Sequence, residues 1–449
     1  MAIESTHLST IVPNLGVGEI ADAVARREIT PIEIVEALLE RVAATEGKVQ
    51  AWSYLDAAGA RAQARILSDE VVTGRLRGPL HGVPFGIKDE FHVEGLPTGM
   101  RALDILPMEP EDATVVTRLR AAGAIVMGKT HMPVRNKELP TRNPWNQEHT
   151  AGGTSSGSGA SVGARMVPFA IGEQTMGSNL RPACYCGCAG LKPTYGRISR
   201  FGCFPFAWSV DHVGLIGRSF SDLALVLSVL AGPDSKDHTA IADSAPPADL
   251  QLEAMRPPRI GLVRNFALDR SEPVVLEALE RSVSLMKQAG AQISDFNLPD
   301  EFPLVYQADR IVTAAEGATF HADEHPDMDL SGSAGRSGAL VPATYYLQAR
   351  RMRAWLTEKV LAAIGPLDAI LTPTTPAPAP KPPGTGNATF LVPWSFLGFP
   401  AITVPCGLSP EGLPMGLQFI TRPRADYQLL QVGAWTENVI GRLPAPPLP

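Results

Sequence analysis

Glycine and hydroxyl side chains are concentrated in one stretch of the chain, which limits how the chain can fold. From Gly152 to Ser178 the sequence holds seven glycines and seven serine or threonine residues, around the apolar run 166–171. Glycine at this density permits positive φ angles and close backbone approach, and the hydroxyls supply candidate nucleophiles and proton relays. A flexible linker is also rich in glycine and serine, but it would not contain this apolar run. The stretch therefore indicates a hydrolase-like active site built from hydroxyls and backbone amides.

The composition is that of a globular protein with a large core. The chain has 449 residues, of which 45% are hydrophobic and 19% are charged, a size that single large α/β enzyme folds can reach. The net charge of −7 and the lack of a basic cluster argue against nucleic acid or an anionic membrane as the main partner. The first residues show no signal-peptide pattern, and no apolar run approaches the length of a membrane span. We therefore expect a cytoplasmic protein.

The five cysteines do not form the pattern of a disulfide framework. Their number is odd, and Cys184, Cys186 and Cys188 are very closely spaced, so we expect reduced thiols. Three thiols without a second cluster are a weak zinc site, and we expect no metal.

Predicted helices and strands alternate along most of the chain. Thr30 and Glu33 form a capping box with proline at the first helical position, which predicts a helix to about residue 44. Residues 259–296 predict a strand, a helix and a strand, which is a βαβ pattern. Further helices are predicted over 57–70, 113–122, 220–231 and 426–439, and further strands over 124–130, 368–374, 401–406 and 415–420. We expect one continuous α/β domain with N-terminal helices packed onto it.

Two short motifs are misleading. Residues 123–130 match the P-loop spelling G-x-x-x-x-G-K-T, but a helical pattern precedes them and their variable positions predict a strand. Residues 153–157 match G-x-S-x-G, the nucleophile elbow of Ser-His-Asp hydrolases, but no apolar strand precedes them. Neither motif has the context that its chemistry requires.

Lys88 is the better partner for the hydroxyl-rich stretch. Its neighbours Phe85 and Ile87 are apolar, which predicts that the lysine is partly buried. Burial without a paired charge lowers a lysine pKa by up to about 3–5 units, and a neutral lysine can serve as general base for a serine. The alternative is a structural ion pair with Asp89 or Glu90, and Lys88 alone does not decide between the two.

Several motifs, in order along the chain, together resemble the amidase signature family of C–N hydrolases. The similarity extends from about residue 15 to 440 and is carried chiefly by GPLHGVPFGIKDEF, GGTSSGSGAS, TMGSNLRPACYCG and GLKPTYGRIS. The resemblance implies an α/β fold whose central mixed, twisted sheet is covered by helices on both sides. It also implies a Ser-Ser-Lys triad with no metal or organic cofactor. Within one domain over 1–449, we expect an N-terminal helical segment over 15–70, a catalytic core over 80–232 and a C-terminal α/β portion over 258–440.

The resemblance assigns the triad residue by residue. Lys88 matches the catalytic lysine, and Ser178 matches the nucleophile. The bridging serine of the family, which follows a cis peptide bond, lies 24 positions before the nucleophile, where this chain has Thr154. The branched Cβ of threonine restricts χ1, so the relay hydroxyl belongs either to Thr154 or, after a local shift, to Ser155.

The resemblance also assigns an oxyanion hole and a substrate contact. The backbone amides of Thr175, Met176 and Gly177, together with that of the nucleophile, would hold the developing negative charge. Gln174 and Arg181 resemble the malonamidase branch of the family, and both are predicted to contact the substrate. In that branch the arginine meets a substrate carboxylate; the alternative for Arg181 is an ion pair with a structural carboxylate.

The sequence thus predicts a hydrolase that cleaves small amides, anilides or carbamates through an acyl-enzyme. It is most similar in motif pattern to malonamidase-type members and to bacterial members that cleave aryl amides and urethanes. Residues 135–139 and 323–337 are candidate selectivity loops, and a homodimer is compatible with the family. Two alternatives stay open: the glutaminase subunit of a tRNA-dependent amidotransferase, and a catalytically silent member that acts as a binding protein.

Overall fold

The computed structural model of the chain describes residues 5–99, 110–133, 140–243, 252, 256–324 and 337–449. The helices are α1 Ser5–Ile11, α2 Val17–Ala25, α3 Pro31–Val49, α4 Ala57–Val72, α5 Thr114–Ala121, α6 Ser156–Gly163, α7 Leu180–Tyr185, α8 Phe220–Leu230, α9 Pro273–Gln288, α10 Val305–Glu324, α12 Ala343–Ile364, α13 Val392–Phe396 and α14 Asp426–Ile440. The strands are β1 Trp52–Leu55, β2 Pro84–Lys88, β3 Ile125–Thr130, β4 Phe169–Gln174, β5 Ala189–Lys192, β6 His212–Gly217, β7 Arg259–Val263, β8 Gln292–Phe296, β9 Ala369–Pro373, β10 Ala401–Leu408 and β11 Pro414–Ile420.

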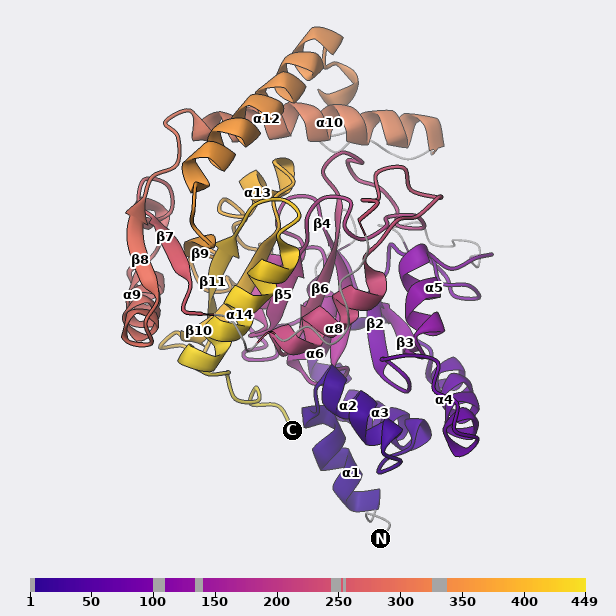
Figure 1. Cartoon of the computed structure of the whole chain (residues 1–449). Coiled ribbons are helices and arrows are strands. Elements are labelled where there is room, and N and C mark those ends of the chain that lie inside the picture. The colour runs from indigo at the N-terminus through magenta and orange to yellow at the C-terminus, as the bar shows by residue number, and fades with distance from the viewer. Residues whose placement is uncertain (1–4, 100–109, 134–139, 244–251, 253–255, 325–336) are drawn as a thin grey trace.

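One continuous sheet runs through the described part of the chain. Its eleven strands lie in the order β1-β3-β2-β4-β6-β5-β10-β11-β9-β7-β8 (Figure 1). Strand β2 is parallel to β3 and β4, and β7 is parallel to β8 and β9. The other pairs, from β4–β6 to β11–β9 and at the β1 edge, are antiparallel. The mixed sheet predicted from the resemblance is therefore confirmed.

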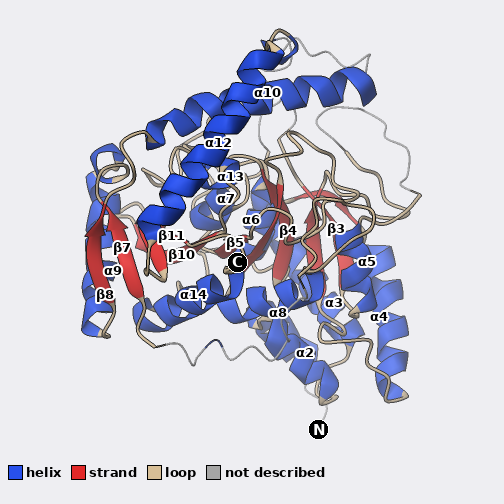
Figure 2. Ribbon diagram, turned by 45° about the horizontal axis from the view of Figure 1, so that its top comes forward, coloured by secondary structure: helices blue, strands red, loops and turns tan. Residues whose placement is uncertain are grey.

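Helices cover both faces of this sheet (Figure 2). Successive side chains of a strand point to opposite faces, and β10 shows what each face meets. Ile402 lies beside Gly433 of α14 and Phe220 of α8. The next residue, Thr403, lies beside Gly416, which also faces the Cys184 sulfur of α7. Helices α8 and α14 therefore cover one face, and α7 covers the other.

The N-terminal helices form as the sequence predicts. The Thr30 hydroxyl accepts a hydrogen bond from the Glu33 backbone N–H, and the Glu33 carboxylate accepts one from the Thr30 backbone N–H. This capping box starts α3, which continues to Val49, beyond the predicted end. Helix α3 packs on α4, and α4 packs on β3, so these helices border the β1–β3 end of the sheet.

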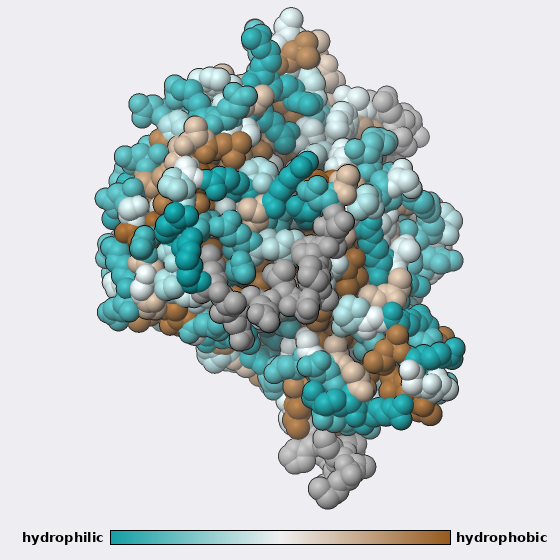
Figure 3. Space-filling view, in the orientation of Figure 1, coloured by the Kyte–Doolittle hydropathy of each residue, from teal (hydrophilic) through white to brown (hydrophobic). Residues whose placement is uncertain are grey.

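Helices α10 and α12 pack against each other and stand above the sheet in Figure 1, and neither was predicted from the sequence. The two candidate selectivity loops fall on residues 134–139 and 325–336, almost wholly outside the described residues. The face in Figure 3 is mostly hydrophilic, with scattered hydrophobic groups. Among the described helices, none combines the length and the apolar composition that crossing a bilayer requires.

The order of the sheet places the end of β2 beside the end of β4. The two strands are parallel neighbours, with Phe85 opposite Phe169 and Ile87 opposite Ile171. The carboxyl-terminal ends of parallel strands meet at the same edge of a sheet, so Lys88 lies close to Glu173 although 85 residues separate them. This edge carries the candidate active site.

Candidate active site

Lys88 is fully buried and surrounded by three oxygen acceptors. Its Nζ atom donates to Thr154 Oγ1 at 2.8 Å and to Glu173 Oε2 at 2.9 Å. It also lies 2.7 Å from Glu90 Oε1. Asp89, the other carboxylate considered from the sequence, instead pairs with Lys129 at 3.2 Å. The structure thus brings the predicted lysine to the hydroxyl-rich stretch and, at the same time, places it between two carboxylates.

The prediction of a resting neutral lysine is wrong. Burial acts to lower the pKa of Lys88, but the charges and hydrogen bonds of Glu173 and Glu90 outweigh burial, and the pKa is raised. The sequence-based expectation considered burial without a paired charge, whereas the structure supplies two carboxylates. The resting side chain is therefore an ammonium group, and it makes both the hydroxyl contact and the ion pairs.

Thr154, rather than Ser155, presents its hydroxyl to Lys88. Ser155 Oγ donates to the Glu173 carbonyl at 3.1 Å and accepts from the Glu173 backbone N–H at 3.2 Å. Its side chain is completely buried and fastens the loop to β4. Ser155 therefore has a structural position, and Thr154 is the hydroxyl within reach of the lysine.

A backbone hydrogen bond joins the Thr154 segment to Ser178. The N–H of Ser155 donates to the Ser178 carbonyl at 3.1 Å. Gly153 makes this close approach possible, because its φ is +62° and a Cβ there would lie 3.1 Å from the Ser178 carbonyl oxygen and 2.7 Å from Pro182 Cδ. Two turns that are far apart in sequence, before α6 and before α7, therefore lie side by side.

The bond between Gly153 and Thr154 is not cis, although the family resemblance predicts a cis bond there. Within the described residues the cis peptide bond is Pro382–Pro383. Glycine at position 153 lets the turn form with a trans bond.

The turn before α7 leaves backbone donors free. The N–H groups of Thr175, Met176 and Gly177 have no acceptor among the described residues, and the Ser178 hydroxyl likewise has no hydrogen-bond partner there. A Cβ on Gly177 would lie 2.8 Å from Ala388 Cβ and 2.9 Å from Leu391 Cδ1, so the turn packs closely against the segment before α13. Free donors beside a free hydroxyl are what an oxyanion hole requires.

Arg181 is buried without a carboxylate partner in the described part of the chain. Its Nη1 donates to the Gly386 carbonyl at 2.5 Å, and its buried Nε has no partner. Burial lowers its pKa, while Tyr185 acts in the opposite direction. The described residues thus provide no structural ion pair of the kind considered as the alternative. A guanidinium left in this state one helical turn after Ser178 is suited to bind an anionic group of a ligand.

Gln174 does not have the substrate contact predicted for it. Its Oε1 accepts from the backbone N–H groups of Asn179 and Leu180, at 3.1 and 2.9 Å, and its Nε2 donates to Ser395 Oγ at 2.9 Å. The side chain is completely buried. Gln174 therefore caps the start of α7 and ties it to α13.

A second carboxyl group lies behind Glu173. The Thr175 hydroxyl lies 3.0 Å from Glu173 Oε1 and 2.8 Å from Asp211 Oδ1. The other oxygen of Asp211 accepts from the backbone N–H groups of Phe206 and Ala207, at 2.8 Å each. Burial, reinforced by the charge of Glu173, raises the pKa of Asp211 to about 8. Asp211 is therefore a neutral acid at pH 7.

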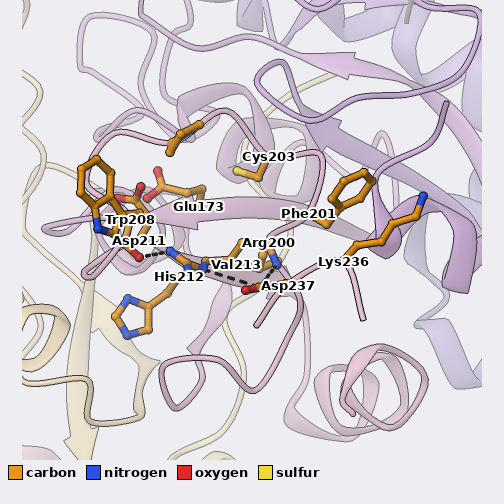
Figure 4. Close-up of a pocket in the computed structure, with 11 residues that line it drawn as sticks. Glu173, Arg200, Phe201, Cys203, Trp208, Asp211, His212, Val213, Lys236 and Asp237 are labelled. Carbon is orange, nitrogen blue, oxygen red and sulfur yellow. Dashed lines mark hydrogen bonds and ion pairs between the residues drawn. The ribbon is translucent and has the colours of Figure 1, made fainter. Parts of the chain in front are cut away.

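Glu173 and Asp211 line a cavity of about 170 Å3, together with Cys203 and Trp208 (Figure 4). Trp208 is 37% exposed, so the cavity reaches the surface. Sequence reasoning missed Glu173 and Asp211 because neither lies in a recognisable pattern with Lys88. The adjacency of β2 and β4, which would have paired Glu173 with Lys88, is not visible in the sequence.

The described residues contain no group of three or more histidine, cysteine or acidic side chains that could hold a metal ion. All five cysteines are free thiols. Burial raises the pKa of Cys184 and Cys188 to about 12, so these thiols stay protonated.

Comparison with known proteins fits this geometry. The family model described as Amidase matches residues 33–430. The chain belongs to the amidase family. It is therefore an amidase-signature hydrolase, an enzyme that acts on amides, and its single mixed α/β fold is shared by solved members of the family.

Relatives of this amidase have several activities. The glutamyl-tRNA(Gln) amidotransferase GatA-type chain of Roseiflexus castenholzii is 35% identical over 93% of this chain and 94% of its own length. A structure described as a vestigial protein complex that reveals the origins of an s-triazine catabolic enzyme is 30% identical, with a TM-score of 0.88 over 96% of this chain and 100% of its own. Peptide amidase from Stenotrophomonas maltophilia is 27% identical, with a TM-score of 0.83 over 96% and 98%. The curated relatives thus favour the amidotransferase alternative more than the sequence motifs did.

Proposed function

We propose that this amidase hydrolyses the C–N bond of a small amide or carbamate that also carries a carboxylate. The buried guanidinium of Arg181, close in sequence to the nucleophile and without a carboxylate partner in the described residues, carries this proposal. A substrate carboxylate would give the guanidinium the charged acceptor that it lacks. The same feature favours substrates with an anionic end over neutral anilides or aryl carbamates.

The residues have distinct roles in the proposed reaction. Ser178 attacks the carbonyl carbon and forms the acyl-enzyme, while Thr154 takes the proton from the Ser178 hydroxyl. The backbone N–H groups of Thr175, Met176 and Gly177 hold the negative charge on the carbonyl oxygen. Thr154 then returns a proton to the leaving amine, and water hydrolyses the acyl-enzyme.

A substrate panel tests the proposal. The purified protein is incubated with monoamides of dicarboxylic acids, L-glutamine, carbamates, anilides and esters, each with and without a carboxylate where the chemistry allows. Amine or ammonia release and the mass of the acyl-enzyme are measured. We expect turnover of the carboxylated amides or carbamates, and faster hydrolysis of the neutral analogues would contradict the proposal.

A second candidate function is the glutaminase subunit of a tRNA-dependent amidotransferase. The relatives named as subunits of glutamyl-tRNA(Gln) amidotransferase support it, because they match nearly the full length of the chain at 33–35% identity. Glutamine also carries a carboxylate and an amide, so Arg181 is compatible with it. Glutamine-dependent ammonia release that appears only with partner subunits of such a complex would favour this function over a free-standing hydrolase.

The third alternative, a catalytically silent binding protein, is addressed by labelling. A fluorophosphonate reacts with an activated serine and needs no knowledge of the natural substrate. We expect the wild-type protein to be labelled at Ser178, as located by peptide mass spectrometry. A folded protein that takes up no label would be the silent member.

A further inference from the structure

The resting contacts of Lys88 leave it unable to accept a proton. An ammonium group has three N–H bonds and no lone pair. The three acceptors around Nζ, which are Thr154 Oγ1, Glu173 Oε2 and Glu90 Oε1, lie at 2.8, 2.9 and 2.7 Å. A proton from Ser178 can therefore pass through Thr154 to Lys88 only if Lys88 first gives a proton away.

We propose that Glu173 is the terminal proton acceptor of the relay, so that the base of this amidase is a carboxylate that acts through Lys88. This inference rests on the proposed acyl-enzyme function. It adds a fourth residue to the triad, at a position that no motif assigned.

The proton steps balance. Lys88 Nζ–H transfers its proton to Glu173 Oε2, which turns the ion pair into an amine and a carboxylic acid. The amine rotates about Cε–Nζ and points its lone pair at Thr154 Oγ1. As Ser178 Oγ bonds to the carbonyl carbon, its proton moves to Thr154, and the Thr154 proton moves to Lys88. Lys88 ends as an ammonium group and Glu173 as a carboxylic acid, and the reverse movement supplies the proton for the leaving amine.

Glu173 is better placed for this role than Glu90. Its Oε2 accepts a hydrogen bond from Lys88, while its Oε1 continues through the Thr175 hydroxyl to Asp211. Asp211 and Glu173 both line the cavity that reaches the surface at Trp208 (Figure 4). A proton on Glu173 thus has a connection to solvent that does not pass through the substrate side.

The Thr175 hydroxyl fixes where the neighbouring proton lies. It has one proton and faces two carboxyl oxygens, so it can donate to only one of them. The other oxygen must carry a proton of its own and donate to Thr175. With Asp211 as the neutral acid, Asp211 donates to Thr175 and Thr175 donates to Glu173. A single buried negative charge is thereby held on Glu173, next to Lys88.

The test compares two carboxylates that touch the same lysine. The rate of Ser178 labelling by a fluorophosphonate is measured for the wild type, Glu173→Gln and Glu90→Gln. A purely electrostatic role predicts faster labelling in both variants, because each loses a charge that raises the pKa of Lys88. The proposal predicts that Glu173→Gln slows labelling by about 100-fold or more, as expected for loss of a general base. It predicts faster labelling in Glu90→Gln.

Asp309→Asn is the matched control. Asp309 is a buried carboxyl group on α10, away from Lys88, and burial raises its pKa to about 7. Neutralising it changes a buried carboxyl without touching the relay, and we expect wild-type labelling. Glu173→Gln that labels as fast as the wild type, or an equal loss in Glu173→Gln and Glu90→Gln, would overturn the proposal.

Chemical rescue protects the test against a folding defect. Glu173→Ala leaves space beside Lys88 that adjoins the cavity, and formate is a carboxylate small enough to enter. We expect formate, but not chloride at equal ionic strength, to restore labelling of Glu173→Ala by at least tenfold. If formate and chloride act alike on a variant whose thermal unfolding is cooperative, Glu173 is not the acceptor.

The pH profile gives a readout that a structural role would not change. Without Glu173, labelling requires Lys88 to lose its proton to solvent, so the rate in Glu173→Gln should rise steadily from pH 6 to 9, while the wild-type rate changes much less. An unchanged shape of the profile would contradict the proposal. The other titratable or charged groups that face this cluster are Glu90, Cys203, Asp211, His212, Arg200 and Asp237.

These measurements separate the two levels of inference. Labelling needs no amide substrate, so a wild type that is labelled but hydrolyses nothing in the panel contradicts the proposed substrates and leaves Glu173 as the acceptor. A wild type that hydrolyses carboxylated amides, with Glu173→Gln equally active, contradicts the role of Glu173 alone.

Discussion

Lys88 Nζ and Glu173 Oε2 lie 2.9 Å apart at the ends of two parallel neighbouring strands. This contact gives the lysine a charged resting state and separates two tasks that a neutral lysine would combine. Lys88 conducts the proton, and the carboxylate receives it. Substitutions on either side of this pair test the rest of the site.

Removing the nucleophile or the lysine should abolish acylation. We expect Ser178→Ala and Lys88→Ala to lower the rate of acyl-enzyme formation by about 10^4-fold or more, as found when a member of a hydrolytic triad is removed. Lys88→Ala also leaves Glu90 and Glu173 close together without a cation, so its thermal unfolding is measured alongside. Wild-type acylation in either folded variant would remove the assignment.

The relay hydroxyl should belong to Thr154. Thr154→Ser keeps the hydroxyl and removes the branch at Cβ, so we expect equal or higher activity. Thr154→Ala removes the contact with Lys88 and should lower kcat by about 10^2–10^4-fold. Steady-state kinetics of the two variants on one substrate checks this. A silent Thr154→Ala would move the relay elsewhere.

Ser155→Ala should affect stability more than chemistry. The substitution removes the hydroxyl that both donates to and accepts from the Glu173 backbone in a completely buried position. We expect a loss of about 1–3 kcal/mol in the free energy of unfolding, measured by denaturant titration. A stable variant that is catalytically dead would instead identify Ser155 as the relay.

Arg181→Met should weaken binding of carboxylated substrates. Loss of a charge-assisted hydrogen bond costs about 1.5–3 kcal/mol, which corresponds to a rise of roughly 10–100-fold in KM. The KM of neutral substrates should change little. Arg181→Lys is the matched control, since it keeps the charge and loses the planar fork. Equal effects on charged and neutral substrates would indicate a structural role through Gly386.

Asp211 should make stability depend on pH. Its folded pKa of about 8 is raised, first by burial and then by the charge of Glu173, above the value of about 3.9 in an unfolded chain. Between pH 4 and 8 the unfolded chain therefore binds fewer protons than the folded protein, and this group lowers stability as pH rises, on the order of 1 kcal/mol per pH unit.

Asp211→Asn removes this titration, and its amide oxygen can still accept from Phe206 and Ala207. We expect the difference in unfolding free energy to shift in favour of the variant from pH 5 to pH 8. Denaturant unfolding of the two proteins at both pH values measures it. A difference that stays constant would show that Asp211 is already ionised at pH 5.

Local signals predicted much of the fold. The capping box at Thr30 starts α3, and the βαβ pattern over 259–296 appears as β7, α9 and β8. Helices α10 and α12 were not predicted, although they are long. Many of their side chains are polar, and α12 leaves Tyr345 and Leu347 exposed, so its apolar residues do not form a single stripe.

The site was predictable in its residues and less so in its charges. Lys88, Thr154 and Ser178 follow from motif order, and the structure brings the first two into contact. The charge of Lys88 depends on Glu173, which lies on a different strand, and pairing of β2 with β4 is a long-range property. Whether Arg181 has a partner is likewise decided by the whole fold, because it depends on which carboxylates the fold brings near it.

The bond from the Ser155 amide to the Ser178 carbonyl makes two distant turns into one rigid unit. Because Ser155 is also anchored to β4, neither turn can shift by itself to admit a bulkier molecule. Diversification of substrate choice in such a scaffold must then be confined to surrounding segments, while the reacting centre is inherited unchanged.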